Sequence, residues 1–298
     1  MLFRPLAVVL AVFLVQAVSP ADAQVTLKLK FTEGATYKFR NAQKVVQTIG
    51  LGEKTKFEGK SDVTMTTTMV CGQRDEEQNL TYKTTFDSIV AELQGFGTKV
   101  KFDSAKLDVK SENELFAAAL DNFRKMFEST LAVTLDKDNQ FVSVEGGFEQ
   151  GAELYFDEIK TAFVQSTNRF PTAPVKKGDT WERTEEVPLG QGQTFVLHRK
   201  YQYAGTLEKG GAKLDKITAT DLSVDYVVKD EDAPIKVKES DLKVASSKHT
   251  IFFDRKLGRV VDEQGELQVK GSIKVSNMGM EYDGTFDLKV DEHSQVVD

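Results

Sequence analysis

Apolar and polar residues alternate over most of the chain after residue 24. Residues 25–31 alternate strictly between apolar and polar side chains, which is the pattern of a half-buried strand. Runs rich in β-branched and aromatic residues, which favour the same conformation, follow at residues 37–49, 56–70, 80–93 and 100–107. We therefore expect residues 24–110 to form a strand-rich N-terminal half.

The pattern changes at Ser111. Over residues 112–130 the apolar side chains recur at spacings of three and four, which predicts an amphipathic helix. Ser111 followed by Glu114 is the pattern of a capping box, so Ser111 is the expected N-cap. A hairpin turning at residues 136–139 comes next, and a second helix is expected over residues 148–166. Residues 111–170 are thus predicted to form a helix–hairpin–helix segment.

Alternation returns after Pro171 and Pro174. Glycines separate the expected strands, which lie at residues 181–186, 193–207, 213–228, 235–238, 245–254, 259–262, 266–275 and 280–290. We expect residues 171–290 to form a second strand-rich half and residues 291–298 to form a frayed tail.

One short element recurs at the start of both halves. Gly34 precedes Tyr37 by three residues, and Gly178 precedes Trp181 in the same way, with a threonine before each aromatic residue. Glycine supplies a turn conformation that other residues avoid, and the Thr-aromatic pair favours a strand. A later hairpin also recurs, at residues 133–142 and 251–260. The echoes fit an internal duplication, or the turn chemistry that any two strand-rich halves share.

These patterns together predict an α+β protein that is mainly antiparallel β. We expect a large curved sheet or open half-barrel, made of two strand-rich halves, with two helices packed on it.

The first 23 residues are typical of a signal peptide. Arg4 precedes an apolar run at residues 6–18, and Ala21 and Ala23 form a small-x-small cleavage site. We predict cleavage after Ala23 and export to the periplasm or the extracellular space; the alternative is an uncleaved N-terminal anchor. We expect no membrane-spanning segment after this cleavage site.

Charge and cysteine content limit the classes of partner and scaffold. The formal net charge is −7, and acidic and basic residues are interleaved, which argues against nucleic acid as a partner. Cys71 is the only cysteine, so a disulfide within the chain is excluded. Cys71 is either a small residue near the end of a strand or a thiol for intermolecular chemistry.

Sequence motifs give no catalytic site. His198, His249 and His293 lie far apart and have no neighbour at a metal-ligand spacing. The chain has no G-x-S-x-G motif, and a calcium loop beginning at Asp136 would have Phe141 in place of its glycine and Gly147 in place of its glutamate. We therefore expect no catalytic residue, metal or cofactor, although a pair of carboxylates brought together by folding would leave no motif.

Phenylalanine is abundant, with twenty residues, and several lie in the predicted helical segment. Phe116, Leu120, Phe123 and Phe127 form an apolar stripe on the first helix. On a curved sheet, this stripe either lines a cavity for an apolar ligand or fills the core beneath the sheet.

Three short motifs carry a resemblance to a known family. They are L-x-L-K-F-x-x-G-x-x-Y at residues 27–37, P-V-x-x-G-D-T-W at 174–181 and F-D-x-x-x-G-R-V-V at 253–261. With the signal peptide, they resemble a family of secreted bacterial envelope proteins that has no established activity. In outline the expected fold is also similar to that of periplasmic lipoprotein carriers, and a fold does not determine a function.

The leading hypothesis is therefore an exported, non-enzymatic envelope protein that binds a lipid or other apolar ligand between sheet and helices. The alternative is a module for protein–protein interaction or scaffolding in the cell envelope. A hydrolase with a carboxylate-based site is the third hypothesis.

Overall fold

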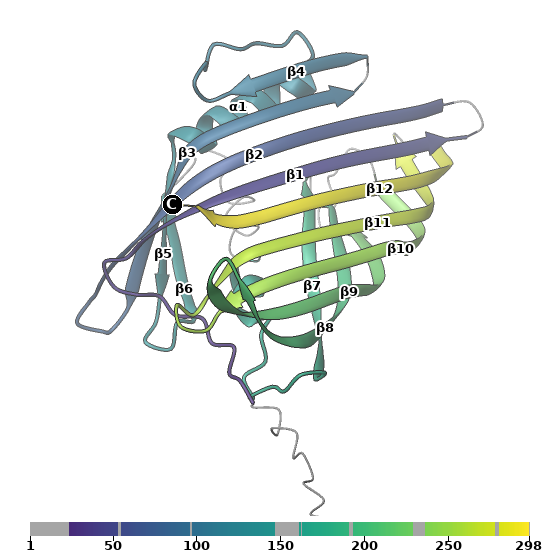
Figure 1. The fold of residues 1–298 in the computed structure, drawn as a ribbon. Helices are drawn as coiled ribbons and strands as arrows, with labels where there is room; N and C mark the ends of the chain where they lie inside the picture. The colour runs from purple at the N-terminus through teal and green to yellow at the C-terminus, as the bar shows by residue number, and fades with distance from the viewer. Residues whose placement is uncertain are drawn as a thin grey trace, which may run out of the picture.

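Figure 1 shows the computed structural model, which describes residues 24–52, 55–95, 97–146, 161, 163–190, 193–228, 236–277 and 280–297. The elements of the N-terminal half are β1 (Thr36–Leu51), β2 (Thr55–Arg74), β3 (Leu80–Gly95), β4 (Thr98–Asp103), α1 (Glu114–Glu128), β5 (Thr130–Leu135) and β6 (Phe141–Gly146). Those of the C-terminal half are β7 (Thr180–Gly190), β8 (Gln193–Lys209), β9 (Ala212–Val228), β10 (Lys236–Asp254), β11 (Arg259–Asn277) and β12 (Met280–Val297).

All twelve described strands belong to one antiparallel sheet. Its order is β6-β5-β3-β2-β1-β12-β11-β10-β9-β8-β7, and β4 also pairs with β3, beyond the part of β3 that pairs with β5. The first and last strands, β1 and β12, join the two halves. The sheet is open, with β6 and β7 at its two ends. The predicted fold class, a large and mainly antiparallel open sheet, is confirmed.

The sheet curls so that its two halves face each other (Figure 1). Phe195 on β8 makes an edge-to-face contact with Phe286 on β12, with ring centroids 5.8 Å apart, although three strands separate β8 from β12 in the sheet. We call the concave surface that carries these two rings the inner face. Because apolar residues alternate along each strand, they collect on this face and bury one another.

Two further segments cover parts of the inner face. Helix α1 packs on β3 and β4, where Leu120 is 1% exposed and joins Ile89 and Phe102 in one apolar cluster. The extended N-terminal segment covers β8–β10, where Val25 and Leu27 are buried with aromatic and aliphatic residues of those strands. The described helices include none that is long and apolar enough to cross a membrane.

The prediction of a strand at residues 25–31 was wrong. The alternation correctly marks Val25 and Leu27 as buried, but this segment makes only one isolated bridge, between Val25 and Val175. Its apolar side chains are buried by packing across the inner face, so a ladder of hydrogen bonds is not needed to explain the alternation.

Helix α1 lies where the spacing of apolar residues predicts it, but its N-cap is Asn113. The Asn113 Oδ1 atom accepts a hydrogen bond from the backbone N–H of Phe116 at 3.3 Å, and Ser111 Oγ accepts one from the N–H of Asn113. Most of the predicted second helix, 148–166, lies outside the described residues; residues 163–168 are helical.

Several predicted strand ends in the C-terminal half were also wrong. Strands β10 and β11 each replace two shorter predicted strands, so Gly265 and Gly271 lie inside β11. The predicted frayed tail, 291–298, is part of β12 as far as Val297. It is ordered because it pairs with β1 on one side and with β11 on the other.

Both halves open with the same local structure. Gly34 and Gly178 have positive φ angles of 70° and 94°, and Tyr37 and Trp181 are each the second residue of the following strand. Internal duplication stays a prediction.

Candidate functional site: a polar row inside an apolar hollow

A row of polar residues crosses the middle of the inner face. Gln43 of β1 pairs directly with Glu292 of β12, Glu292 pairs with Gly265 of β11, and Gly265 pairs with His249 of β10. Directly paired residues of antiparallel strands point to the same face. The four positions therefore form one continuous row, which we call the polar row.

Gly265 allows the two ionisable side chains of the polar row to approach each other. A Cβ atom at this position would lie 2.5 Å from both His249 Nδ1 and Glu292 Oε1. These two atoms are 3.6 Å apart. Glycine inside a strand often marks such a close approach, and here it places an imidazole and a carboxylate side by side across a third strand.

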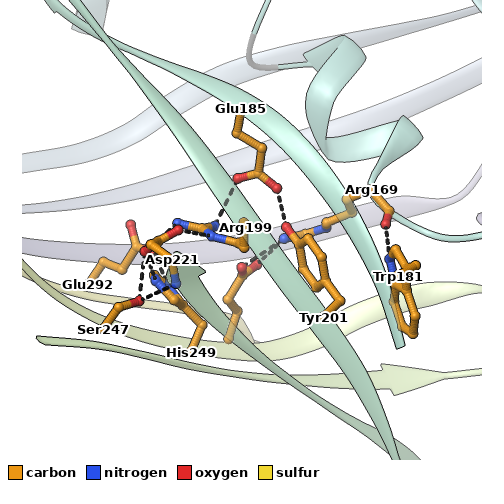
Figure 2. Close-up of polar contacts among 10 residues, drawn as sticks. Arg169, Trp181, Glu185, Arg199, Tyr201, Asp221, Ser247, His249 and Glu292 are labelled. Carbon is orange, nitrogen blue, oxygen red and sulfur yellow. Dashed lines mark hydrogen bonds and ion pairs between the residues drawn. The ribbon is translucent and has the colours of Figure 1, made fainter. Parts of the chain in front are cut away.

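His249 belongs to a buried network of charged groups (Figure 2). Its ring is 3% exposed, and its Nε2 atom lies 3.0 Å from Asp221 Oδ2. Asp221 also accepts hydrogen bonds from Ser247 Oγ at 2.7 Å and Arg199 Nε at 2.7 Å. Because Ser247 donates to the carboxylate and not to the imidazole, the group lacks the Ser–His hydrogen bond of a serine nucleophile.

The network continues toward β7 and residue 169. Arg199 Nη1 donates to Glu185 Oε2 at 2.8 Å, and Tyr201 donates to the other oxygen of Glu185. Arg169 donates to both oxygens of Glu263 at 2.7 and 2.9 Å. Each arginine therefore has its carboxylate partners within the protein, which limits the cost of burying its charge.

Two β-bulges lie beside this network. On β9, Leu222 is an extra residue between the pairs Arg199↔Asp221 and His198↔Ser223. On β10, Ala245 is an extra residue between Val244 and Ser246. A bulge shifts the alternation by one residue and redirects the side chains next to it. Asp221 and Ser247, which are close to these bulges, consequently point toward each other on the inner face.

The pKa shifts show that the network favours charged groups. Burial opposes the ionised form of Asp221, but hydrogen bonds from His249 and Arg199 outweigh it and hold the pKa of Asp221 below its usual range. Contact with His249 lowers the pKa of Glu292 despite its partial burial. Burial opposes the charge on His249, but its two carboxylate neighbours raise its pKa. A carboxyl acid catalyst needs the opposite shift, toward a raised pKa, so Asp221 and Glu292 do not support the hydrolase hypothesis.

Two cavities meet at the polar row. A cavity of about 400 Å³ lies between α1 and the sheet, and its apolar wall contains Val63, Met65, Phe123 and Met126. A second cavity of about 200 Å³ lies deeper between the two halves of the curled sheet, with an apolar wall formed by Val45, Val187, Phe195, Leu197, Leu267, Leu288 and Val290. Gln43 and Glu292 line both cavities, while His249 and Arg199 line the second.

The four residues predicted to line an apolar site have different surroundings. Leu120 is enclosed in the packed cluster under α1, and Phe116 and Phe127 pack against that cluster. Phe123 stacks on Phe102, with ring centroids 5.4 Å apart, and also lines the 400 Å³ cavity. The space beside α1 is thus partly a filled core and partly a cavity.

The aromatic residues of the two recurring turn elements, Tyr37 and Trp181, both pack against neighbouring side chains. Trp181 stacks on Tyr201 at 5.5 Å and donates from Nε1 to the carbonyl oxygen of Arg169 at 2.7 Å. Arg259 lies over the ring of Tyr37, 4.6 Å from its centroid.

Cys71 is 2% exposed and packs with Tyr82. Burial raises the pKa of its thiol, which disfavours a reactive thiolate.

Sequence reasoning missed the polar row and its network. One local signal was available: His249 lies at an inward position of the alternating run that contains Ile251 and Phe253, and all three are buried. A polar residue within such a run indicates a buried polar partner. The identity of that partner depends on strand register, which local patterns do not give.

Elsewhere in the described chain, one further pocket and the possible metal ligands do not form a candidate site. A pocket of about 570 Å³ lies between the N-terminal segment, the turn at residues 138–140 and residues 167–172, but its wall includes many exposed polar side chains. In the described part of the chain, no group of three or more His, Cys, Asp or Glu side chains is placed to hold a metal ion.

Neither a protein-family model nor a curated protein sequence matches the chain. A structure of lipovitellin that concerns its lipid–protein interactions has 10% identity and a TM-score of 0.47; the match covers 90% of this chain and 26% of that chain. DynF, from the dynemicin biosynthesis pathway of Micromonospora chersina, has 9% identity, coverage of 97% and 92%, and a TM-score of 0.18. An outer membrane channel from Pseudomonas putida F1 has 11% identity, coverage of 94% and 100%, and a TM-score of 0.18.

This chain spans about a quarter of the lipovitellin chain. Likenesses at these scores assign neither a family nor a function. The resemblance to secreted envelope proteins, drawn from three sequence motifs, therefore stays a prediction.

Proposed function

We propose that this protein binds an apolar or amphiphilic small molecule, such as a lipid, in the hollow between α1 and the inner face, without chemically changing it. The observation that carries the proposal is the 400 Å³ cavity, which has an apolar wall from β2 and α1 and a polar row at its edge. Cavities of roughly 300–1,000 Å³ with apolar walls and a few polar groups are typical of small-molecule sites.

The second cavity extends the proposed site. It meets the first at Gln43 and Glu292 and has apolar walls from both halves of the sheet. An apolar chain placed there would be removed from water on several sides, which stabilises the complex by roughly 25 cal/mol for each Å² of apolar surface buried. The polar row would then lie beside the polar end of the molecule.

A matched pair of substitutions tests this proposal. Val63 of β2 lines the 400 Å³ cavity, whereas Thr64, the next residue, points to the opposite face. We expect Val63→Phe to fill part of the cavity and to weaken binding of a neutral fluorescent hydrophobe, N-phenyl-1-naphthylamine, by about ten-fold or more, because lost burial of only ~1.4 kcal/mol has that effect. Thr64→Phe adds a similar volume on the other face and should leave the affinity unchanged.

Native mass spectrometry of the purified wild-type protein gives a second measurement. We expect saturable binding of the hydrophobe in solution and retention of an apolar molecule in the gas phase. The proposal is overturned if the wild-type protein neither retains such a molecule nor binds the hydrophobe saturably. It is also overturned if Val63→Phe and Thr64→Phe, both folded by circular dichroism, bind equally well.

We further propose that residues 1–23 act as a signal peptide that directs export of the protein, and that binding takes place outside the cytoplasm. The support is the sequence pattern of these residues, which lie outside the described part of the chain. Mass determination of the protein recovered from a periplasmic fraction tests this: the expected N-terminus is Gln24, and an intact N-terminus would contradict cleavage.

A module for protein–protein interaction in the envelope is the second candidate. It is favoured by the open ends of the sheet, since β7 pairs with β8 alone and β6 with β5 alone among the described strands. Such edges can accept a strand from a partner. Under this alternative, Val63→Phe would leave partner binding intact. A proline on β7, at a position whose backbone N–H points away from β8, would abolish partner binding.

A further inference from the structure

We infer that the polar row is a subsite for a positively charged head group, so that the preferred ligand is an amphiphile with a primary ammonium group on an aliphatic chain. This inference rests on the proposed function and specifies the ligand class. It is carried by the position of Glu292 where the two cavities meet, by an unpaired nitrogen of His249 in the same place, and by the excess of negative charge in the network behind them.

Glu292 is the most available charged group of the polar row. Its side chain is 41% exposed, and it lines both cavities. Among the described residues its one ion-pair contact is with His249, at 3.6 Å, which is too long for a hydrogen bond. The other carboxylates of the network have short hydrogen bonds to arginine. Glu292 therefore retains acceptor capacity that faces the hollow.

In its neutral form, His249 supplies a second acceptor at the same place. Its Nδ1 atom is buried and has no hydrogen-bond partner within the described chain, while Nε2 lies beside Asp221. When the neutral ring donates from Nε2 to Asp221, Nδ1 is an acceptor. A primary ammonium group has three N–H donors, so one such group can donate to Glu292 in either state of the ring, and to His249 Nδ1 as well when the ring is neutral. A carboxylate head group has no donor for either atom.

The charge of the whole network favours the same choice. It contains two arginines and four carboxylates, namely Arg169, Arg199, Glu185, Asp221, Glu263 and Glu292. With neutral His249 the network carries two negative charges, and with protonated His249 it carries one. In either state, a cation placed in an apolar hollow beside this network is attracted and a carboxylate is repelled.

Neighbouring cations do not reverse this balance. Arg199 lines the smaller cavity, but its guanidinium is engaged by Glu185 and Asp221. His293 lines the larger cavity and contacts Asp262, which also pairs with Lys209. A fatty acid, the ordinary probe for a lipid-binding hollow, is therefore expected to be a poor ligand.

Three probes with the same chain length test the inference: dodecylamine, dodecanol and dodecanoate. Each is titrated below its micelle concentration or solubility limit, in competition with N-phenyl-1-naphthylamine. We expect the amine to bind about ten-fold or more tightly than the alcohol, because hydrogen bonds to charged groups are worth roughly 1.5–3 kcal/mol. We expect dodecanoate to bind more weakly than the alcohol.

Glu292→Gln should lower the ratio of amine to alcohol affinity toward one. The matched control is Glu266→Gln, which removes the same charge from an exposed position on the opposite face of β11 and should keep the wild-type ratio. If Glu292→Gln does not fold, Gln43→Lys is the second variant. It places a cation on β1 directly opposite Glu292 and should also lower the ratio.

The possible outcomes separate this inference from the proposed function. The inference of an ammonium subsite is overturned if the wild-type ratio of amine to alcohol affinity is near one, or if dodecanoate binds as tightly as the amine. In both cases the hollow still binds apolar molecules, so the proposed function stands. A wild-type preference for the amine that persists in folded Glu292→Gln or Gln43→Lys also overturns it. If none of the three probes displaces the hydrophobe, and the hydrophobe itself does not bind, the proposed function fails.

Discussion

The two halves of the sheet bury the same inner face but treat charge differently. In the described N-terminal half, every ion pair has at least one side chain that is 41% exposed or more. In the C-terminal half, the side chains of Arg199 and Asp221 are 10% and 0% exposed. Glu263 of β11, 17% exposed, pairs with Arg169, which lies just before this half and is 15% exposed. One half rests on apolar packing under a helix, and the other places ions within its core.

The difference shows that the buried network is not needed simply to close the sheet. The N-terminal half buries Ile89, Phe102 and Leu120 in an apolar cluster. The arginine beside this cluster, Arg124, donates to the backbone carbonyl oxygens of Leu107 and Val109. Buried ion pairs lose hydration energy that their mutual attraction barely restores, and apolar residues often replace them without loss of stability. A network in this position is more naturally explained by the hollow that it borders.

The largest expected effect comes from removing the central cation of the network. Arg199→Met leaves Asp221 and Glu185 buried without their arginine partner. We expect a loss of roughly 3–5 kcal/mol in the free energy of unfolding, measured by urea denaturation, because an uncompensated buried charge is costly.

Lys44→Met is the matched control in the other half. It breaks the pair with Asp62, whose two side chains are 65% and 50% exposed, and solvent screening makes such a pair worth little. We expect no measurable change. Equal losses for the two variants would contradict the contrast between the halves.

The apolar cluster of the N-terminal half gives the next largest effect. Leu120 is 1% exposed among Ile89, Val100 and Phe102. Leu120→Ala should lower the free energy of unfolding by about 2–5 kcal/mol, because it removes buried apolar area and leaves a void. Leu222→Ala, at a 54% exposed position on β9, should cost roughly 0.5 kcal/mol or less. A small loss for Leu120→Ala would show that α1 packs loosely.

Most of the fold was predictable from the local sequence pattern. The errors in the predicted strand ends have one common cause, which is that pairing with distant strands is not visible in that pattern. Period-two alternation predicts strands wherever one face is buried, and a spacing of three and four predicts α1. Gly265 separates two of the predicted strands because glycine usually punctuates strands. It lies inside β11, where a Cβ atom would be only 2.5 Å from His249 Nδ1 and Glu292 Oε1. The order of residues 291–297 likewise depends on pairing with β1, at the far end of the sequence.

The candidate site was much less predictable than the fold. Gln43, Gly265 and Glu292 form a row only because β1, β12 and β11 pair in one register, and shifting a strand by one residue would send its side chain to the other face. The apolar stripe on α1 is visible in the sequence, so Phe123 could be predicted to line a cavity. The same stripe contains Leu120, which is packed in the core, and the sequence does not distinguish the two positions.

The third prediction tests the glycine of the polar row. Gly265→Ala introduces a Cβ atom 2.5 Å from both His249 Nδ1 and Glu292 Oε1, so the two side chains must separate. We expect a loss of about 1–3 kcal/mol, as for other overpacked sites, together with weaker binding of dodecylamine. Gly59→Ala on β2 is the control, because nothing lies within 4 Å of its added Cβ. Gly59→Ala should be neutral or slightly stabilising. If both variants lose a similar free energy of unfolding, the loss is a general effect of replacing a strand glycine and not of crowding at the polar row.

The smallest predicted effect concerns pH. Burial opposes the charge on His249, but the hydrogen bond to Asp221 and the nearby carboxylate of Glu292 raise its pKa above the ordinary value of 6.5. A raised folded pKa contributes stability that is fully present below about pH 6.5 and is lost as pH rises through the folded pKa. The difference in unfolding free energy between wild type and His249→Gln should therefore shrink as pH rises above about 6.5.

Acid conditions should act through the carboxylates in the opposite direction. The pKa of Asp221 is held below its ordinary value of 3.8, so its contribution is present above that pH and is lost as pH falls through the folded pKa. Urea denaturation of wild type and His249→Gln at a series of pH values measures these differences. If the His249→Gln difference grows with pH instead, His249 is held neutral in the folded protein, and the attraction between β10 and β12 at the polar row cannot depend on its charge.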